Sequence, residues 1–433
     1  MRTRSGLDHS LSAGPWKHQT PMASSQVRLR ILPSVRCLFD KPVQVKVEGL
    51  SPHAPVVLRS KVLDDRGVVF RAEAQYQADH GGHVDASRDP SLGGSYTGVE
   101  PMGLFWSMLP ETPHNKLLKK SALTPMQVQI SALSGETVLA TEVNQREFMP
   151  EGMRRIPVRE GRLRGVLFVP PGPGPFPGIV DLYTFGGGLS EPRASLLACK
   201  GFVVLALAYK GYEDLPKNPE YLDLEYFEEG VTYLRSQPQV AGSGVGVISI
   251  SHSGGLALSM ASFLDHIAAT VCVNGCNANT VIPLRYRDLV LPPLQPVLEN
   301  VSVLPDSGLL NGRHAMPDPL LHPSSLIPIQ RATSHFLLAA SEDDHNWESA
   351  LYARQAAAIL KSHGKDTCSL AVYSKSGHFL EAPHMPFCPS AVHAVVGRAV
   401  AFGGEARAHA QDQLHLWERV QRFFKRHLGD LSL

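Results

Sequence analysis

The chain has 433 residues, and its formal net charge at pH 7 is +1. This near balance of acidic and basic side chains excludes the strongly basic surface that nucleic-acid binding requires. No run of apolar residues approaches the roughly 18 to 20 of a membrane-spanning helix. A chain of this length exceeds one core, so we expect about two domains of roughly 100 to 250 residues each.

The two ends of the chain carry weak targeting features. Residues 1–21 hold three basic side chains against a single acid, a composition with some similarity to a mitochondrial presequence, but one that favours a disordered tail. The final Leu431-Ser432-Leu433 is similar to the peroxisomal S-K-L signal without its basic middle residue. No secretory signal follows the first methionine, so we expect an intracellular protein, in the cytoplasm rather than in mitochondria or peroxisomes.

Residues 22–153 are predicted to form an antiparallel β-sandwich of the immunoglobulin-like kind. Short apolar or alternating segments, separated by turn-rich loops and with hardly any helical period, are typical of that architecture. The expected strands are residues 27–31, 43–47, 56–62, 68–76, 126–130 and 138–143. We expect this half of the chain to serve packing or to shape a substrate site.

Residues 154–433 are predicted to form an α/β domain. Apolar strands at residues 163–169, 178–183 and 202–208 alternate with segments of helical period, as a parallel sheet covered by helices requires. Helical spacing of apolar residues indicates one helix over 224–234 and a last helix over 416–428, which has three basic residues in its last turn and Gly429 at its end.

The segment from Val245 to Met260 has the pattern of a nucleophile elbow. An apolar run ends at Ser251 and turns directly into a helix of small residues, which presents the serine hydroxyl above the sheet edge and the next backbone N–H toward a developing oxyanion. Ser249 and Ser253 stand where the G-x-S-x-G pattern has glycine. Ser253 is an alternative nucleophile, and we favour Ser251 because it directly follows the apolar run.

An acid and a base follow two later strands. The apolar run 335–340 ends before Asp344, and the run around residues 370–373 is followed by His378. Serine needs an imidazole to take its proton and a carboxylate to orient that imidazole, and the order Ser, Asp, His is that of α/β-hydrolases. Asp343 is an alternative acid and His345 an alternative base.

The oxyanion donors are predicted from position. The backbone N–H of His252 follows the nucleophile, and that of Phe185 lies in a glycine-rich loop after an early strand, where the fold carries its second donor. The six cysteines form no C-x-x-C pair and no metal-ligand spacing with histidine, so we expect free thiols, no metal and no cofactor.

The elbow, the segment from Ser341 to Trp347 and the stretch Ser376-Gly377-His378-Phe379-Leu380-Glu381-Ala382-Pro383 resemble the acyl-CoA thioesterase family that also contains bile acid-CoA:amino acid N-acyltransferase. The similarity runs from about Met22 to near the C-terminus. It implies an α/β-hydrolase fold with a catalytic triad of Ser251, Asp344 and His378. It also implies an acyl-CoA substrate, so that coenzyme A is part of the substrate rather than a cofactor.

The resemblance leaves two activities open. The family's thioesterases usually have glycine at the positions of Ser249 and Ser253, whereas the N-acyltransferase has a cysteine nucleophile. An oxyester acyl-enzyme is attacked well by activated water, whereas a thioester acyl-enzyme reacts more readily with an amine, so Ser251 favours hydrolysis over conjugation to glycine or taurine. A catalytically impaired relative is the third alternative, because the added Cβ at Ser253 is expected to crowd the turn.

Overall fold

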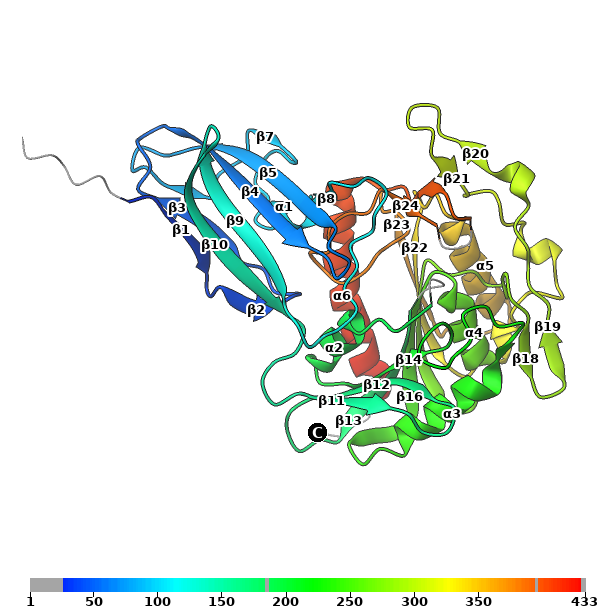
Figure 1. Ribbon diagram of the computed structural model, residues 1–433. Coiled ribbons are helices and arrows are strands. Elements are labelled where there is room, and N and C mark those ends of the chain that lie inside the picture. Colours follow the sequence, from blue (N-terminus) through cyan, green and yellow to red (C-terminus); the bar gives the residue numbers. More distant parts are fainter. Residues whose placement is uncertain (1–25, 184–186, 394–395, 430–433) are drawn as a thin grey trace, which may run out of the picture.

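The computed structural model describes residues 26–183, 187–393 and 396–429. Three sequence predictions fall outside these ranges: the N-terminal tail, the C-terminal tripeptide and the backbone N–H of Phe185. Figure 1 shows two parts of the chain, a β-rich part at the N-terminal end and a larger part in which helices cover a central sheet.

The N-terminal part is a sandwich of two sheets, as predicted. Alternate residues of its long strands point inward, as in β4, where Val56, Leu58, Ser60 and Val62 are buried. One sheet has the order β1 (Arg28–Leu32), β3 (Gln44–Glu48), β6 (Val84–Asp85). The other has the order β2 (Arg36–Leu38), β10 (Thr137–Glu147), β9 (Met126–Ser134), β4 (Pro55–Leu63), β5 (Val69–Gln77), β7 (Gly93–Gly94), with β8 (Leu109–Pro110) also beside β5.

The sandwich is not wholly antiparallel. The three-residue strand β2 runs parallel to β10 at the edge of its sheet, because the chain passes from β1 in one sheet directly to the edge of the other. A single helical turn, α1 (Gly103–Trp106), is buried beside β4 and β5. The division of the chain at residues 153 and 154 stays a prediction, with β10 ending at Glu147 and β11 beginning at Arg154.

The second part is an α/β-hydrolase sheet of eight strands. Their order is β11 (Arg154–Val158), β12 (Arg164–Val169), β14 (Val203–Ala208), β13 (Phe176–Leu182), β16 (Val240–Ile250), β17 (Ile267–Val273), β22 (His335–Ser341), β23 (Cys368–Tyr373). The pairs β11–β12 and β12–β14 are antiparallel, and all later pairs are parallel. The carboxyl ends of β13, β16, β22 and β23 therefore meet along one edge of the sheet, where a site is expected.

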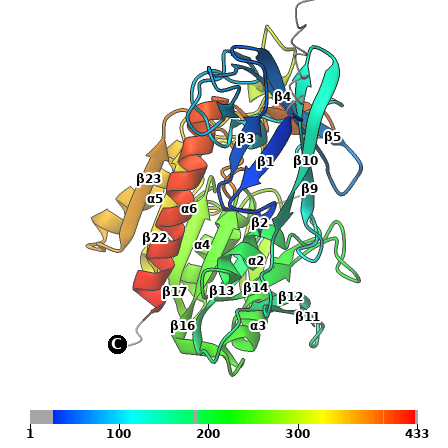
Figure 2. The same cartoon turned by 90° about the vertical axis from the view of Figure 1, so that its left-hand side faces the viewer.

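Helices cover both faces of this sheet (Figures 1 and 2). On one face, α2 (Pro192–Ala198) and α6 (Ala406–Leu428) pack on side chains such as Ile179, Ile248 and Val271. On the other, α3 (Leu224–Arg235), α4 (Ser253–Phe263) and α5 (Ser349–Ser362) pack on alternate residues such as Val180 and Val247. The predicted helices at 224–234 and 416–428 are parts of α3 and α6.

The sandwich lies against the face that carries α2 and α6, and one apolar core continues through both. Core side chains from β3 and β4 belong to the same buried cluster as those of α2 and α6. Polar contacts reinforce the junction, since Trp417 of α6 donates its indole N–H to Asp40, 2.9 Å away, and Lys200 pairs with the same carboxylate. The sandwich is thus packed onto the hydrolase rather than linked loosely to it.

Several small elements between and beside the sheet strands were not predicted. A three-stranded sheet has the order β15 (Leu222–Asp223), β18 (Leu284–Tyr286), β19 (Leu289–Leu291), and a four-stranded sheet has the order β20 (Ser302–Val303), β21 (Leu310–Asn311), β25 (Ala399–Ala401), β24 (Ser390–Val392). Three short 3₁₀ turns are η1 (Leu298–Asn300), η2 (Pro319–Leu321) and η3 (Ile329–Arg331). Among the described residues, no helix combines the length and apolarity needed to cross a membrane.

Candidate active site

Ser251 sits in a strained turn between β16 and α4. Its φ is +62°, in the left-handed region that non-glycine residues rarely adopt, and such strain is typical of functional positions. The Ser251 N–H donates to the carbonyl of Val273 on the neighbouring strand, 2.9 Å away. The predicted strand, strained serine and helix are therefore all present in the described structure.

The close approach of strand and helix depends on glycines that the sequence analysis did not single out. A Cβ on Gly254 would lie 2.5 Å from the Cα of Gly275, which follows β17, and a Cβ on Gly255 would lie 3.0 Å from the carbonyl oxygen of Ala278. Backbone occupies these spaces and cannot move aside like a flexible side chain. The turn thus needs glycine at 254 and 275, and not at 249 or 253.

Both unexpected serines of the elbow are buried and hydrogen-bonded. The Ser253 hydroxyl lies 2.9 Å from the carbonyl oxygens of Leu182 and Ile250, and it accepts the Ile250 N–H at 3.0 Å. The Ser249 hydroxyl donates to the carbonyl of Val271 at 3.0 Å. Ser253 is fully buried, so it ties the turn to β13 and is not presented as a nucleophile, and its Cβ does not crowd the turn.

Ser251, His378 and Asp344 lie together at the carboxyl edge of the sheet, although they come from three separate loops. His378 Nε2 lies 2.8 Å from the Ser251 hydroxyl, and His378 Nδ1 lies 2.7 Å from Asp344 Oδ2. All three residues are at least 94% buried, with relative exposures of 6%, 1% and 1% for Ser251, Asp344 and His378. The imidazole can therefore accept the serine proton while its other nitrogen donates to the carboxylate.

The carboxylate of Asp344 is fully engaged as an acceptor. Oδ2 also receives the Ser349 hydroxyl at 2.5 Å, and Oδ1 receives the N–H of Asn346 at 2.8 Å and that of Trp347 at 3.4 Å. Both carboxylate oxygens therefore accept hydrogen bonds from Asp344's own loop or from α5, in addition to the contact with His378. The orientation of the acid is thus fixed by its own loop and by the first turn of α5.

The alternative acid and base pair with each other instead. Asp343 Oδ1 lies 3.0 Å from His345 Nε2, and Asp343 Oδ2 accepts the N–H of Gly404 at 2.8 Å. The Asp343 side chain is 43% exposed, unlike that of Asp344. The geometry therefore separates two neighbouring carboxylates that the sequence alone left open.

Aromatic rings and one asparagine hold the imidazole in place. Phe402 is stacked on His378 with ring centroids 5.7 Å apart, and Trp347 meets it edge-on at 5.8 Å. Asn274, at the end of β17 with a φ of +46°, donates to the carbonyl of His378 at 2.6 Å and accepts the N–H of Ser341 at 2.7 Å. Asn274 was missed, although a polar residue that ends a buried parallel strand could have indicated it.

One of the two predicted oxyanion donors lies in the described structure. The His252 backbone directly follows Ser251 at the start of α4, and Phe185 belongs to the residues outside the described ranges. The His252 imidazole is buried with Nδ1 3.1 Å from the Thr280 hydroxyl. Burial, with a contribution from the charge of Lys210, lowers the pKa of His252 to about 3, so this side chain is neutral at pH 7.

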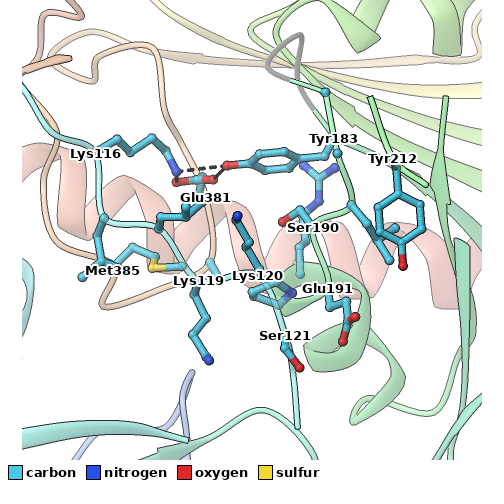
Figure 3. A pocket seen from close by; sticks show the side chains of 18 of the residues that line it. Lys116, Lys119, Lys120, Ser121, Tyr183, Ser190, Glu191, Tyr212, Glu381 and Met385 are labelled. Atoms are coloured by element: carbon cyan, nitrogen blue, oxygen red, sulfur yellow. Dashed lines mark hydrogen bonds and ion pairs between the residues drawn. The ribbon is translucent and has the colours of Figure 1, made fainter. Parts of the chain in front are cut away.

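A cavity of about 590 Å³ lies between the sandwich and the hydrolase sheet (Figure 3). Residues 116–121 line it from the sandwich side, and Tyr183, Gly187, Gly188 and Glu381 line it from the hydrolase side. Two of its lining residues are close in sequence to elements of the triad: Tyr183 follows Leu182, which is paired with Ser249, and Glu381 is three residues beyond His378. The cavity is therefore lined by both parts of the chain.

The cations of this cavity differ in their partners. Lys116 is paired with Glu381 at 2.7 Å and Lys119 with Asp65 at 3.1 Å. Lys120 makes no ion pair within the described chain, and its amine points into the cavity in Figure 3. One lysine is thus available to a negatively charged ligand.

Comparison with known proteins agrees with the geometry. The family described as "BAAT / Acyl-CoA thioester hydrolase C terminal" matches residues 222–430, and the "Acyl-CoA thioester hydrolase/BAAT N-terminal region" matches residues 40–160. The chain belongs to the acyl-CoA thioester hydrolase/BAAT family. Acyl-coenzyme A thioesterase 2, mitochondrial, from Mus musculus is 46% identical over 96% of this chain and 92% of its own length.

Two further proteins complete the comparison. Acyl-coenzyme A thioesterase 1 from Homo sapiens is 48% identical over 92% of this chain and 96% of its own length. The solved acylaminoacyl peptidase of Pyrococcus horikoshii is 14% identical with a TM-score of 0.45, over 91% of this chain and 60% of that one. Membership of the family confirms the resemblance that the sequence analysis stated from its motifs.

Proposed function

We propose that the protein is a serine hydrolase that cleaves acyl-CoA thioesters to a free fatty acid and coenzyme A. The observation that carries the proposal is the hydrogen-bonded chain from Asp344 through His378 to the Ser251 hydroxyl, buried at the carboxyl edge of the sheet. The names of the relatives, which are acyl-coenzyme A thioesterases, supply the substrate class.

In the proposed reaction, His378 Nε2 takes the proton of Ser251 as the hydroxyl oxygen attacks the thioester carbonyl carbon. The tetrahedral oxyanion is stabilised by the backbone N–H of His252, and Phe185 is the second donor expected from its position in the sequence. Coenzyme A leaves as its thiol with the proton that His378 returns, and an acyl ester remains on Ser251. His378 then activates water, which releases the fatty acid, while Asp344 holds the imidazole in its working tautomer throughout.

Entry of the substrate is proposed through the cavity between the sandwich and the hydrolase sheet. Coenzyme A carries several phosphate oxygens, and Lys120 is a cation without an ion pair in the described chain. Its ammonium group is suited to contact a phosphate as a point charge. The apolar lining from Leu117, Leu189 and Met385 is suited to the less polar parts of the ligand.

Transfer of the acyl group to glycine or taurine is the second candidate, and the nucleophile argues against it. Ser251 forms an oxyester, which water attacks well, whereas a cysteine would form a thioester, which reacts more readily with an amine. The variant Ser251→Cys is therefore expected to shift the product from free acid toward N-acyl amide when glycine or taurine is present. Mass spectrometry of the products distinguishes the two outcomes.

The decisive experiment is a hydrolysis profile of the purified protein. Release of coenzyme A thiol is measured with short, medium, long and bile-acid thioesters, each with and without glycine and taurine. We expect thiol release with free acid as the main product, and loss of release in Ser251→Ala but not in Ser253→Ala. Absence of release from every thioester would contradict the proposal, and failure of a fluorophosphonate to label the folded protein would favour a catalytically impaired relative.

Cytoplasmic residence is part of the proposal. The relatives of this protein carry names both with and without the word mitochondrial, so family membership does not select a compartment. The untagged full chain, detected with an antibody so that both termini stay free, is expected to be diffuse in the cytoplasm. Co-localisation with a mitochondrial marker would assign a targeting role to residues 1–21.

A further inference from the structure

Three polar groups from distant parts of the chain meet at the wall of the cavity. Lys116 extends from the segment between β8 and β9 of the sandwich, Tyr183 directly follows β13, and Glu381 lies in the loop after His378. The Lys116 ammonium lies 2.7 Å from Glu381 Oε2 and 2.9 Å from the Tyr183 hydroxyl, and that hydroxyl donates to Glu381 Oε1. Figure 3 shows this closed set of contacts, which we call the Lys116 cluster.

The Lys116 cluster is largely shielded from water. The side chains of Lys116 and Glu381 are 23% and 12% exposed, and the ammonium also lies 5.0 Å from the centre of the Phe379 ring. Burial works against the charge of Lys116, but the carboxylate and the hydroxyl outweigh it and raise the pKa of the ammonium. An ion pair this well enclosed is rigid, and removal of one partner leaves the other without compensation.

Each hydrolase member of the cluster belongs to a segment that carries the triad. Glu381 is held in the loop of His378, and Phe379 of that loop packs against Phe402, which itself stacks on the imidazole. Tyr183 extends β13, whose last residue Leu182 offers its carbonyl to the Ser253 hydroxyl of the elbow at 2.9 Å. A shift of the cluster would therefore move both the base and the turn that presents the nucleophile.

The third member is anchored in the sandwich. The carbonyl of Lys116 accepts a hydrogen bond from Arg66 at 2.5 Å, and Arg66 is itself paired with Asp64. The next residues continue the attachment, since the Leu118 N–H donates to Asp64 at 3.2 Å and the Leu118 carbonyl accepts the Asp65 N–H at 3.0 Å. The backbone from which the ammonium extends is thus anchored in the sandwich.

We propose that Lys116 is a positioning residue through which the sandwich holds the His378 loop and the end of β13 in their working geometry. The sandwich then takes part in catalysis, beyond packing or shaping the substrate site. This inference rests on the proposed serine mechanism. It concerns the alignment of Ser251 and His378, so it applies to any electrophile that reaches the serine, whether or not it carries coenzyme A.

The test compares Lys116→Met with Lys46→Met. Lys46 forms an ion pair with Asp85 at 2.9 Å inside the sandwich, with side-chain exposures of 33% and 14%, close to those of the Lys116 pair. Three quantities are measured on the full chain: kcat and KM for a long-chain acyl-CoA, the rate at which a small uncharged fluorophosphonate labels Ser251, and the melting temperature.

Misplacement of reacting groups by about 1 Å costs about 100-fold in rate, so we expect Lys116→Met to lower both kcat and the labelling rate by about 10- to 100-fold. KM should change less than about twofold, since the Lys116 ammonium is already paired with Glu381 and does not reach a phosphate. Lys46→Met should lower the melting temperature by a similar amount to Lys116→Met, but should leave kcat and the labelling rate unchanged. Lys116→Arg, which keeps the charge beside Glu381, should recover most of the labelling rate.

Several outcomes would overturn the inference. An increase in KM with an unchanged labelling rate would make Lys116 a substrate contact, and equal losses in Lys46→Met would make the effect one of general stability. Should Lys116→Met not fold, Tyr183→Phe removes only the bridging hydroxyl, and labelling at the wild-type rate would then refute the proposal. If wild-type protein is labelled but hydrolyses no acyl-CoA, only the proposed function fails; if it is not labelled, both fail.

Discussion

Replacing Asp344 by asparagine tests the candidate triad with almost no change in shape. The amide has one acceptor oxygen and one donor nitrogen, whereas both carboxylate oxygens are acceptors here, Oδ2 for His378 and Oδ1 for the Asn346 N–H. An amide nitrogen at the Oδ1 position would face that N–H at 2.8 Å, donor against donor. The amide nitrogen is therefore expected to face His378.

In that orientation the amide forces His378 into the tautomer that carries its proton on Nε2, the atom 2.8 Å from the Ser251 hydroxyl. The imidazole then has no lone pair for the serine proton. We expect kcat to fall by about 10⁴-fold, or ~5 kcal/mol of transition-state stabilisation, measured by release of coenzyme A thiol from a saturating acyl-CoA.

Asp343→Asn is the matched control, because Asp343 contacts His345 and Gly404 and is 43% exposed. It should retain kcat to within about threefold, in line with the small energies of exposed pairs. Circular dichroism checks that both variants are folded. The assignment of the acid would be refuted by a kcat for Asp344→Asn within tenfold of wild type, or by equal losses in the two variants.

Three further predictions concern the elbow, the cavity and the buried histidines. Gly254→Ala should lower the free energy of unfolding by about 1 to 3 kcal/mol in urea denaturation, because the new Cβ would lie 2.5 Å from the Gly275 backbone; a stabilised variant, as expected for an ordinary helical glycine, would contradict this. Lys120→Ala should raise KM for acyl-CoA by about two- to fivefold at low salt, where a surface charge is least screened. The same variant should hydrolyse an uncharged p-nitrophenyl ester like the wild type. Equal effects on both substrates would exclude a contact between Lys120 and a phosphate of coenzyme A. Burial lowers the pKa of His409 from 6.5 to about 4, and its Nδ1 accepts the Gly377 N–H at 3.1 Å. The unfolded chain therefore binds a proton that the folded protein excludes. The free energy of unfolding is thus full above about pH 6.5 and falls toward pH 4, by up to ~1.4 kcal/mol per pH unit for this group. Urea titrations of His409→Gln should show a slope of the free energy of unfolding against pH that is smaller by about one proton, and an unchanged slope would refute the assignment.

The parts of the fold that the sequence predicted are those with a local signal. Buried strands of a parallel sheet are continuous apolar runs, so β14 and β22 were predicted close to their observed bounds, whereas β16 begins at Val240, five residues before the apolar run that starts at Val245. Ser251, Asp344 and His378 each follow such a run, and parallel strands bring their carboxyl ends to one edge. Strands of two or three residues, such as β6 and β20, have too few side chains to show a period.

The remaining parts of the site depend on contacts between distant segments. Tyr183 and Glu381 are separated by 198 residues, and Lys116 lies 67 residues before Tyr183. No spacing along the chain indicates that these three side chains meet, because each of their segments alone has the composition of an ordinary loop. The choice of Asp344 over Asp343 likewise depends on the direction in which a loop turns, since both residues follow the same strand.

The apolar core that runs from the sandwich onto α2 and α6 has a consequence for how the protein is made and broken down. A truncated transcript that encoded only the hydrolase half would expose the surface around Trp417, whose indole would lose its acceptor Asp40, as would the ammonium of Lys200. Large exposed apolar patches favour aggregation and capture by chaperones and proteases. Selection is therefore expected to keep both halves in a single reading frame.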